Sequence, residues 1–265
     1  MESSSIIYIN SLNRLSGTSN SFTYAIQLSD VDQYDRVTLL QCNIPMSYYM
    51  VQAGYNTFRL QEGATIVTIS IPIGNYSAIS FKAVVLPLIN AASPNHWVYT
   101  MTIPTSFSNA NTGKYTFTVT GNASQPSFIF TTNVYEFFGF TANSTNTFSG
   151  NTLTSTNVVK FIPEDCIMIH SDICDNNENS VLQEVFLNNS SNFSNITYQC
   201  PDIVNYSRKL RTNNSNAYTF YITNENNRLL DLNGLDLIFT IIVFKKEKSI
   251  DLIKDFLKYY LLKQN

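Results

Sequence analysis

The chain has 265 residues, 44% of them hydrophobic and 13% aromatic, which is enough to bury a core as one large domain or two modest ones. Its net charge of −3 and its 13% of charged residues provide no basic surface, so we expect no sequence-specific nucleic-acid binding. Its two histidines, His96 and His170, have no catalytic partner at a recognisable spacing. The composition therefore predicts a protein that builds or binds something, not an enzyme, and no cofactor.

No leader with a basic start and an apolar core opens the chain, and no apolar run reaches the roughly 20 residues of a membrane helix, so we expect no membrane span. The four cysteines, Cys42, Cys166, Cys174 and Cys200, form no CxxC pair and no metal-binding spacing. We expect mostly buried thiols outside disulfides, as in the reducing interior of a cell.

The chain begins with segments in which every second residue is apolar, the period of a strand with one buried face. The first three predicted strands span residues 6–9, 22–28 and 36–44. A middle block follows, with strands at 56–61 and 65–71, a helix at 78–89, strands at 97–103, 114–120 and 127–131, and a helical turn within 134–140. In the helix, Ile79, Ala83, Leu86 and Ile89 keep helical spacing, and Pro87 is expected to kink or shorten it.

Residues 141–155 are nearly all Thr, Asn, Ser and Gly, and we interpret them as a linker. Strand patterns resume at 158–162, 166–173, 181–187, 196–200, 217–223 and 235–244. With the first three they make nine segments, of which 196–200 is a weaker pattern, so the expected architecture is mainly β with about eight strands in the sandwich. It consists of a discontinuous sandwich, residues 1–55 and 156–246, interrupted by an α+β subdomain at 56–155.

A tail follows the last strand, residues 247–265, and 249–263 has the pattern of an amphipathic helix. Ser249 can cap this helix, and lysines precede it. One apolar stripe runs along it, which is our candidate partner-docking site: Leu252, Ile253, Phe256, Leu257 and Tyr260. The helix either packs on its own sandwich or docks on a neighbour, and the pattern alone favours neither.

Residues 170–172, His-Ser-Asp, contain the letters of a serine-protease triad, but alternation along a strand points Ser171 away from the other two. The same alternation puts Ile167, Ile169 and Ile173 in the core with Ser171. We therefore interpret His170 as a strand residue at a surface or subunit contact, with a ligand-binding role as the alternative.

An acidic and amide cluster follows, formed by Asp172, Asp175, Asn176, Asn177 and Glu178. Measured from Asp175, the calcium-loop pattern would need Gly at Ser180 and Glu at Phe186, so the motif fails. We interpret the cluster as a solvated loop, with a weak Ca²⁺ or Mg²⁺ site as the alternative, and we predict no metal site.

Trp97 is the only tryptophan and opens a predicted strand. Its expected place is the core. The alternative is an exposed aromatic platform, built on Trp97 or Tyr76, of a β-sandwich that binds glycans or a receptor in a viral attachment protein.

Several phrases of the sequence resemble the minor capsid, or penton, proteins of virophages and Polinton-like viruses. They are Tyr8-Ile-Asn-Ser-Leu-Asn-Arg-Leu-Ser-Gly-Thr18 with the strand 22–28 after it, Leu40-Gln-Cys-Asn-Ile-Pro-Met-Ser-Tyr-Tyr49, Ile71-Pro-Ile-Gly-Asn-Tyr76 and Asp231-Leu-Asn-Gly234.

The resemblance implies a single jelly roll, here with an inserted domain that points outward, which assembles as a homopentamer at the vertices of an icosahedral virion. It implies a major capsid protein with a double jelly roll as partner, and an inner capsid component or a host receptor as further partners. The family has no catalytic residues to carry over.

Overall fold

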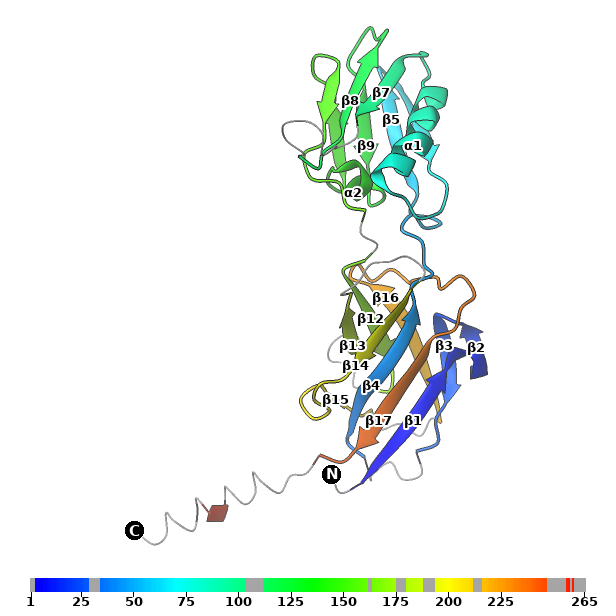
Figure 1. The fold of residues 1–265 in the computed structure, drawn as a ribbon, viewed down its shortest axis with the longest axis vertical. Helices are drawn as coiled ribbons and strands as arrows, with labels where there is room; N and C mark the ends of the chain where they lie inside the picture. The colour runs from blue at the N-terminus through cyan, green and yellow to red at the C-terminus, as the bar shows by residue number, and fades with distance from the viewer. Residues whose placement is uncertain are drawn as a thin grey trace. The chain divides into compact units, whose positions relative to one another are not determined.

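The computed structural model describes residues 3–28, 34–102, 112–161, 164–174, 180–187, 194–211 and 216–246, together with 256, 257 and 259. The chain divides into two compact units (Figure 1). Unit 1 comprises residues 1–48 and 164–265, and unit 2 comprises residues 49–163. Unit 2 is thus inserted between two consecutive strands of unit 1.

Unit 1 contains two antiparallel sheets, which we call sheet A and sheet B. Sheet A has the strand order β1-β17-β4-β14, and the short β15 also pairs with β4. Its strands are β1 (Ser4–Asn10), β17 (Ile238–Phe244), β4 (Arg36–Pro45), β14 (Asn195–Gln199) and β15 (Arg208–Lys209).

Sheet B has the strand order β13-β12-β16-β3-β2. Its strands are β13 (Val181–Phe186), β12 (Cys166–Ser171), β16 (Ala217–Asn224), β3 (Ser21–Ala25) and β2 (Ser16–Thr18). A 3₁₀ helix, η1 (Ser11–Asn13), links β1 to β2 and is capped by Asn10, whose side chain accepts a hydrogen bond from the backbone N–H of Leu12.

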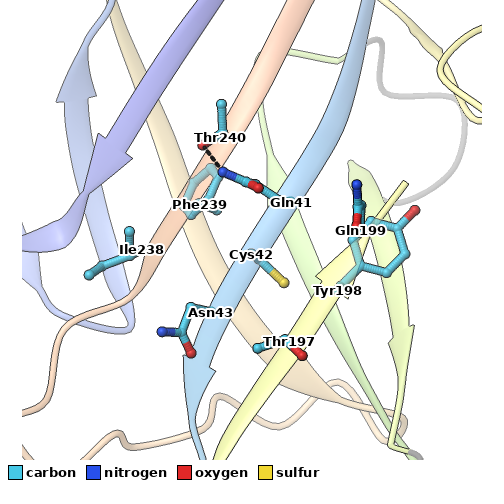
Figure 2. A pocket seen from close by; sticks show the side chains of 9 residues that line it. All are labelled: Gln41, Cys42, Asn43, Thr197, Tyr198, Gln199, Ile238, Phe239 and Thr240. Carbon is cyan, nitrogen blue, oxygen red and sulfur yellow. Dashed lines mark hydrogen bonds between the residues drawn. The ribbon is translucent and has the colours of Figure 1, made fainter. Parts of the chain in front are cut away.

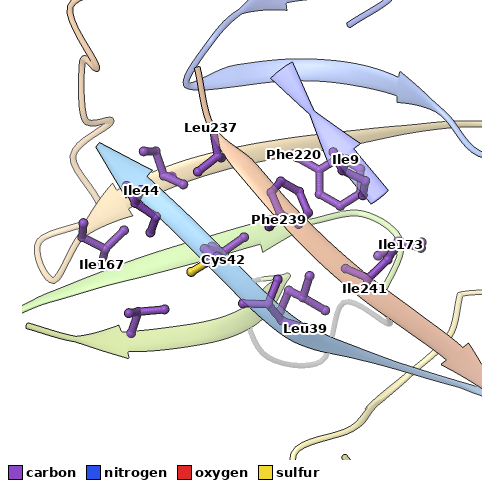
Figure 3. Close-up of a cluster of buried hydrophobic side chains, with 14 of the residues drawn as sticks. Ile9, Leu39, Cys42, Ile44, Ile167, Ile173, Phe220, Leu237, Phe239 and Ile241 are labelled. Atoms are coloured by element: carbon purple, nitrogen blue, oxygen red, sulfur yellow. The ribbon is translucent and has the colours of Figure 1, made fainter. Parts of the chain in front are cut away.

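The core of unit 1 is built from the inward side chains of both sheets, which makes the unit a β-sandwich (Figure 3). Sheet A contributes residues such as Leu39 and Phe239, and sheet B contributes residues such as Ile169 and Phe220. The predicted alternation in β12 is confirmed, since Ile167, Ile169 and Ile173 all belong to this core. The strand pattern found these positions because a half-buried strand must place apolar residues at every second position.

Unit 2 contains a four-stranded sheet of order β10-β9-β5-β6 and a three-stranded sheet of order β11-β8-β7. The strands of the first are β10 (Ser144–Thr147), β9 (Ser127–Phe130), β5 (Thr57–Glu62) and β6 (Thr65–Ser70), and those of the second are β11 (Thr152–Thr154), β8 (Thr116–Thr120) and β7 (Val98–Thr102). Two helices complete the unit, α1 (Ala78–Ala92) and α2 (Tyr135–Phe138).

The core of unit 2 is rich in aromatic rings. The ring of Phe138 lies 4.7 Å from that of Phe58, 5.0 Å from that of Phe130 and 5.1 Å from that of Phe81, measured between ring centroids. These rings come from α2, both strands at the centre of the larger sheet, and α1. The short helix α2 is therefore held by its central phenylalanine, since isolated helices of this length are unstable in water.

The predicted linker at 141–155 is wrong. Residues 144–147 form β10, which pairs with β9, and residues 152–154 form β11, which pairs with β8. Both strands lie at the edge of their sheet, so their side chains stay largely exposed and need no apolar alternation. Because their sequence is polar, no strand pattern predicts them. Phe148, which lies between the two strands, is buried.

The predicted strand at 158–162 is also absent from the described residues 158–161, which belong to unit 2. The backbone N–H of Val159 donates to the carbonyl of Gly113, and Val159 and Phe161 pack against the core of unit 2. Backbone contacts rather than composition thus place the boundaries of unit 2 at 49 and 163, outside the limits of 56 and 155 that we expected.

Helix α1 presents a face to the core that matches the predicted stripe only at Leu86, which is partly buried, and at Ile89. Its buried residues are Phe81, Val85 and Ile89, whereas Ile79 is 70% exposed and Ala83 is exposed as well. The capping signal before the helix is correct, because Ser77 and Ser80 form a reciprocal capping box. The helix also continues past Pro87, since the carbonyl of Ala83 that proline leaves unpaired lies on the exposed side, where water can bond to it.

Candidate interaction surface

His170 is buried on β12, with an exposed fraction of 2%, so its predicted place at a surface is wrong. It lies directly opposite Tyr221 of β16, and the two rings stack with centroids 4.5 Å apart. Its Nε2 is 2.9 Å from Oγ1 of Thr223, which is also buried. A solute cannot reach this imidazole without opening the fold, so the contact serves the packing of sheet B.

The acidic cluster after β12 is described only at Asp172. Its carboxylate accepts a hydrogen bond of 2.7 Å from the backbone N–H of Thr219, which ties the end of β12 to β16. Asp175, Asn176, Asn177 and Glu178 lie outside the described residues. In the part of the chain that is described, no group of three or more His, Cys, Asp and Glu side chains is placed to hold a metal ion.

The alternative function, glycan or receptor binding, needs an exposed aromatic platform, and Trp97 does not provide one. Trp97 is only 7% exposed and belongs to the core of unit 2, as the first interpretation expected. Tyr76 packs its ring edge-on against Phe81 and donates its hydroxyl to the carbonyl of Pro72. Its ring is thus partly buried against its own unit.

The outer face of sheet A carries a shallow hollow of about 450 Å³ (Figure 2). Its outward side chains come from three neighbouring strands: Gln41 and Asn43 of β4, Thr197 and Gln199 of β14, and Ile238 and Thr240 of β17. Nε2 of Gln41 lies 3.4 Å from Oγ1 of Thr240, a long hydrogen bond across the hollow. Such a set of amides, hydroxyls and one aliphatic side chain can bind by hydrogen bonds and apolar contact but contains no charged group.

A β-bulge explains why β4 presents these residues outward. Thr240 pairs with Gln41 and Ile241 pairs with Leu39, so Leu40 is an extra residue in β4. The core therefore takes Leu39 and then Cys42, three positions later. Burial raises the pKa of the Cys42 thiol to about 12, which keeps it neutral and unreactive near pH 7.

A second hollow of about 310 Å³ lies beside the first, and Gln41, Gln199 and Thr240 line both. Ile6 and Tyr8 of β1 border it, with exposed fractions of 52% and 72%. None of the residues that line either hollow is charged. An uncharged and partly apolar sheet face is typical of the central part of a protein–protein interface.

The candidate docking stripe of the tail is described only in part. Phe256 and Leu257 are helical and exposed by 65% and 52%, while Leu252, Ile253 and Tyr260 lie outside the described residues. Tyr259 is also helical and 60% exposed, although the predicted stripe did not include it. Docking of this stripe on a partner stays a prediction.

The alternation of polar and apolar residues in β4 and β14 could have indicated the hollow from sequence, since it separates outward from inward positions. What the sequence could not give is the order of the strands, which brings residues near 41, 198 and 239 together. No disulfide joins the four cysteines. Among the described helices, none is long and apolar enough to cross a membrane.

No family model matches the sequence, and no curated protein matches it. Among solved structures, the chain is similar to the penton protein of mavirus, with 12% sequence identity and a TM-score of 0.46. The match covers 90% of this chain and 99% of that chain. The similar protein is of the same class as the one that the sequence phrases resemble. Because a TM-score below 0.5 does not establish a function, the function is inferred from the strands and surfaces of this chain.

Proposed function

We propose that this chain is a structural capsid protein of the penton type, in which unit 1 is a single jelly roll and five copies close a ring at a vertex of an icosahedral particle. The strand order of unit 1 carries the proposal. Without the short β2 and β15, eight strands remain, and we number them one to eight along the chain. Sheet A then has the order 1-8-3-6 and sheet B the order 5-4-7-2. Two four-stranded antiparallel sheets connected in this crossed manner are the arrangement of a jelly roll, a common capsid fold.

The position of unit 2 supports the same function. It enters the chain between β4 and β12, the third and fourth strands of this count, and it has its own aromatic core. An insertion of this kind adds a module to a jelly roll without changing its strand pairing. We expect the ring to carry unit 2 outward, away from the packed shell.

The surfaces agree with assembly rather than catalysis. His170 and Thr223, which touch each other, are buried, and the hollow of about 450 Å³ on sheet A is shallow and uncharged. A net charge of −3 also limits repulsion between copies in a ring. The partners in this proposal are four further copies and a major capsid protein with a double jelly roll. The tail would contact an inner capsid component, or unit 2 would contact a host receptor. The location would be the vertex of a virion assembled inside the host cell.

Native mass spectrometry or mass photometry of the full chain tests the ring. One copy has a mass of 30.0 kDa, so five copies give 5 × 30.0 = 150 kDa. We expect a species of that mass to be populated at micromolar concentration. A strictly monomeric protein across that range, together with its absence from purified particles, would contradict the proposal.

A further inference from the structure

The two open sides of the sandwich in unit 1 differ in composition. On one side, β1 ends sheet A and β2 ends sheet B, and on the other side β14 and β13 end the same two sheets (Figure 1). We call them the β1 side and the β13 side. The hydroxyl of Tyr24 in β3 reaches the carbonyl of Tyr8 in β1, which shows that the two sheets meet at the β1 side.

The β1 side presents large apolar side chains beside Arg14 and Asp236, whose carboxylate accepts a hydrogen bond from the hydroxyl of Ser11. Tyr8, Leu12 and Leu15 are exposed by 72%, 67% and 63%. Arg14 is the only charged residue between 3 and 18, and its guanidinium donates hydrogen bonds to the carbonyls of Ser11 and Gly17. Arg14 therefore holds the turn that carries both leucines at the surface.

The β13 side presents apolar side chains around a hollow. Phe186, Val204 and Tyr206 are exposed by 67%, 39% and 47%. A hollow of about 240 Å³ is lined by Phe186 and Glu184 of β13 and by residues 205–208, which include Tyr206. Charged residues in 181–187 and 194–209 are Glu184, Asp202, Arg208 and Lys209, so the local sum of formal charges is zero.

Asp202 on the β13 side plays the same part as Arg14 on the β1 side. Its Oδ1 accepts hydrogen bonds from the backbone N–H groups of Val204 and Asn205, both at 3.0 Å. These bonds, chiefly the one from Asn205, lower the pKa of the carboxyl, so Asp202 is ionised near neutral pH. The loop that displays Val204 and Tyr206 is therefore fixed by its own acidic residue.

We propose that the β1 side of one copy packs on the β13 side of the next copy, with Leu12 and Leu15 entering the hollow beside Phe186 and Tyr206. The inference rests on the ring of the proposed function and names the surfaces that close it. Contact between unlike sides is heterologous, which is what a cyclic ring requires. Contact between like sides would instead place leucines against leucines at the β1 side and would leave the hollow of the β13 side unfilled.

Two blocking variants and their mixture test this arrangement. The first carries Leu12→Asp with Leu15→Asp and loses only the β1 side, and the second carries Phe186→Asp with Tyr206→Asp and loses only the β13 side. Because all four side chains are exposed, each variant should keep its melting temperature. Each variant alone should be monomeric by mass photometry, with at least a tenfold loss of the ring species.

The equimolar mixture should form a dimer of 2 × 30.0 = 60 kDa and nothing larger, because one copy still offers an intact β13 side and the other an intact β1 side. The control is Ile66→Asp, an exposed apolar position of β6 in unit 2, which should retain the ring. Rings that persist in either blocking variant would overturn the inference and leave the ring itself intact. Monomeric variants that form no dimer when mixed at tens of micromolar would also overturn it, while a monomeric wild-type protein would overturn the proposed function instead.

Discussion

The hydroxyl of Tyr99 donates a hydrogen bond of 2.8 Å to Oε1 of Glu62, and both residues are buried in unit 2. The same carboxylate accepts hydrogen bonds from Oγ of Ser93, at the end of α1, and from the backbone N–H of Asn95. Burial, and then the bond to Glu62, raise the pKa of Tyr99. One carboxylate thus joins β5, the end of α1 and β7.

Replacing this carboxylate should destabilise unit 2. Glu62→Ala leaves two buried donors, on Ser93 and Tyr99, and the partly exposed backbone N–H of Asn95 without their acceptor, so we expect a loss of at least about 2 kcal/mol in the free energy of unfolding. Tyr99→Phe removes one donor and should cost about 1.5 to 3 kcal/mol. Arg59→Ala, at an exposed position of the same strand, is the control and should change stability by less than about 0.5 kcal/mol. Chemical denaturation measures all three, and equal values for Glu62→Ala and the control would contradict the role given to the carboxylate.

Two buried thiols should make the stability of unit 1 fall at alkaline pH. Burial raises the pKa of Cys42 from 9.0 to about 12, and burial followed by the neighbouring Glu184 raises that of Cys166 to about 12. Below pH 9 both folded and unfolded chains hold these protons. Between pH 9 and 12 only the folded chain does, so stability falls by up to about 1.4 kcal/mol per pH unit and thiol.

Buried tyrosines act in the same direction, so the decisive quantity is a difference between variants. The slope of unfolding free energy against pH, measured from pH 8 to 10.5, should be smaller in Cys42→Ala with Cys166→Ala than in the parent protein. Cys200→Ala, at a half-buried position, is the matched control. A double variant with an unchanged slope would show that these thiols ionise equally in both states.

The single tryptophan should report on unit 2 alone. Trp97 lies in the core of unit 2, so its fluorescence should follow the unfolding of that unit. Phe138→Ala should lower the free energy of unfolding that is derived from the fluorescence transition by about 3 to 5 kcal/mol. Leu39→Ala in the core of unit 1 should leave this value unchanged. Equal shifts in both variants would mean that the units unfold together.

Removing unit 2 should leave a folded sandwich. A chain in which a short Gly/Ser bridge replaces residues 49–163 keeps every strand of unit 1. We expect it to melt in one cooperative transition, observed by circular dichroism. If this chain shows no cooperative transition, unit 2 is needed for the fold of unit 1.

The tail should matter more for assembly than for stability. Burying a large apolar side chain contributes about 1.5 to 3 kcal/mol, so a partner that covers Phe256, Leu257 and their neighbours would gain substantial affinity. Deletion after Lys248 should therefore lower incorporation into particles more than it lowers the melting temperature of the isolated protein. Phe256→Ser with Leu257→Ser should have the same effect as the deletion. Loss of folding on deletion, or unchanged incorporation, would show that the helix only covers its own sandwich.

The sequence by itself was sufficient to predict the strands that have one face in the core and the other face toward solvent. Ile167 and Ile169 in β12, and Ile173 just after it, had to be apolar because they line the core, and that requirement is visible as a period of two. The buried place of Trp97 followed in the same way from its size and apolar character. The sequence could not show β10 and β11, because edge strands satisfy their backbone bonds without an apolar face.

Only the tertiary structure decided which residues share a surface. The extra residue Leu40 shifts the side chains of β4 by one position, so the buried positions change from 37 and 39 to 42 and 44, and the pairing with β17 locates the bulge. Helix α1 has apolar residues on two faces, and the aromatic neighbours of Phe81 select the one that is buried. His170 is buried because Tyr221, 51 residues later, pairs with it. Such contacts depend on strand order, which long-range packing sets and local patterns do not encode.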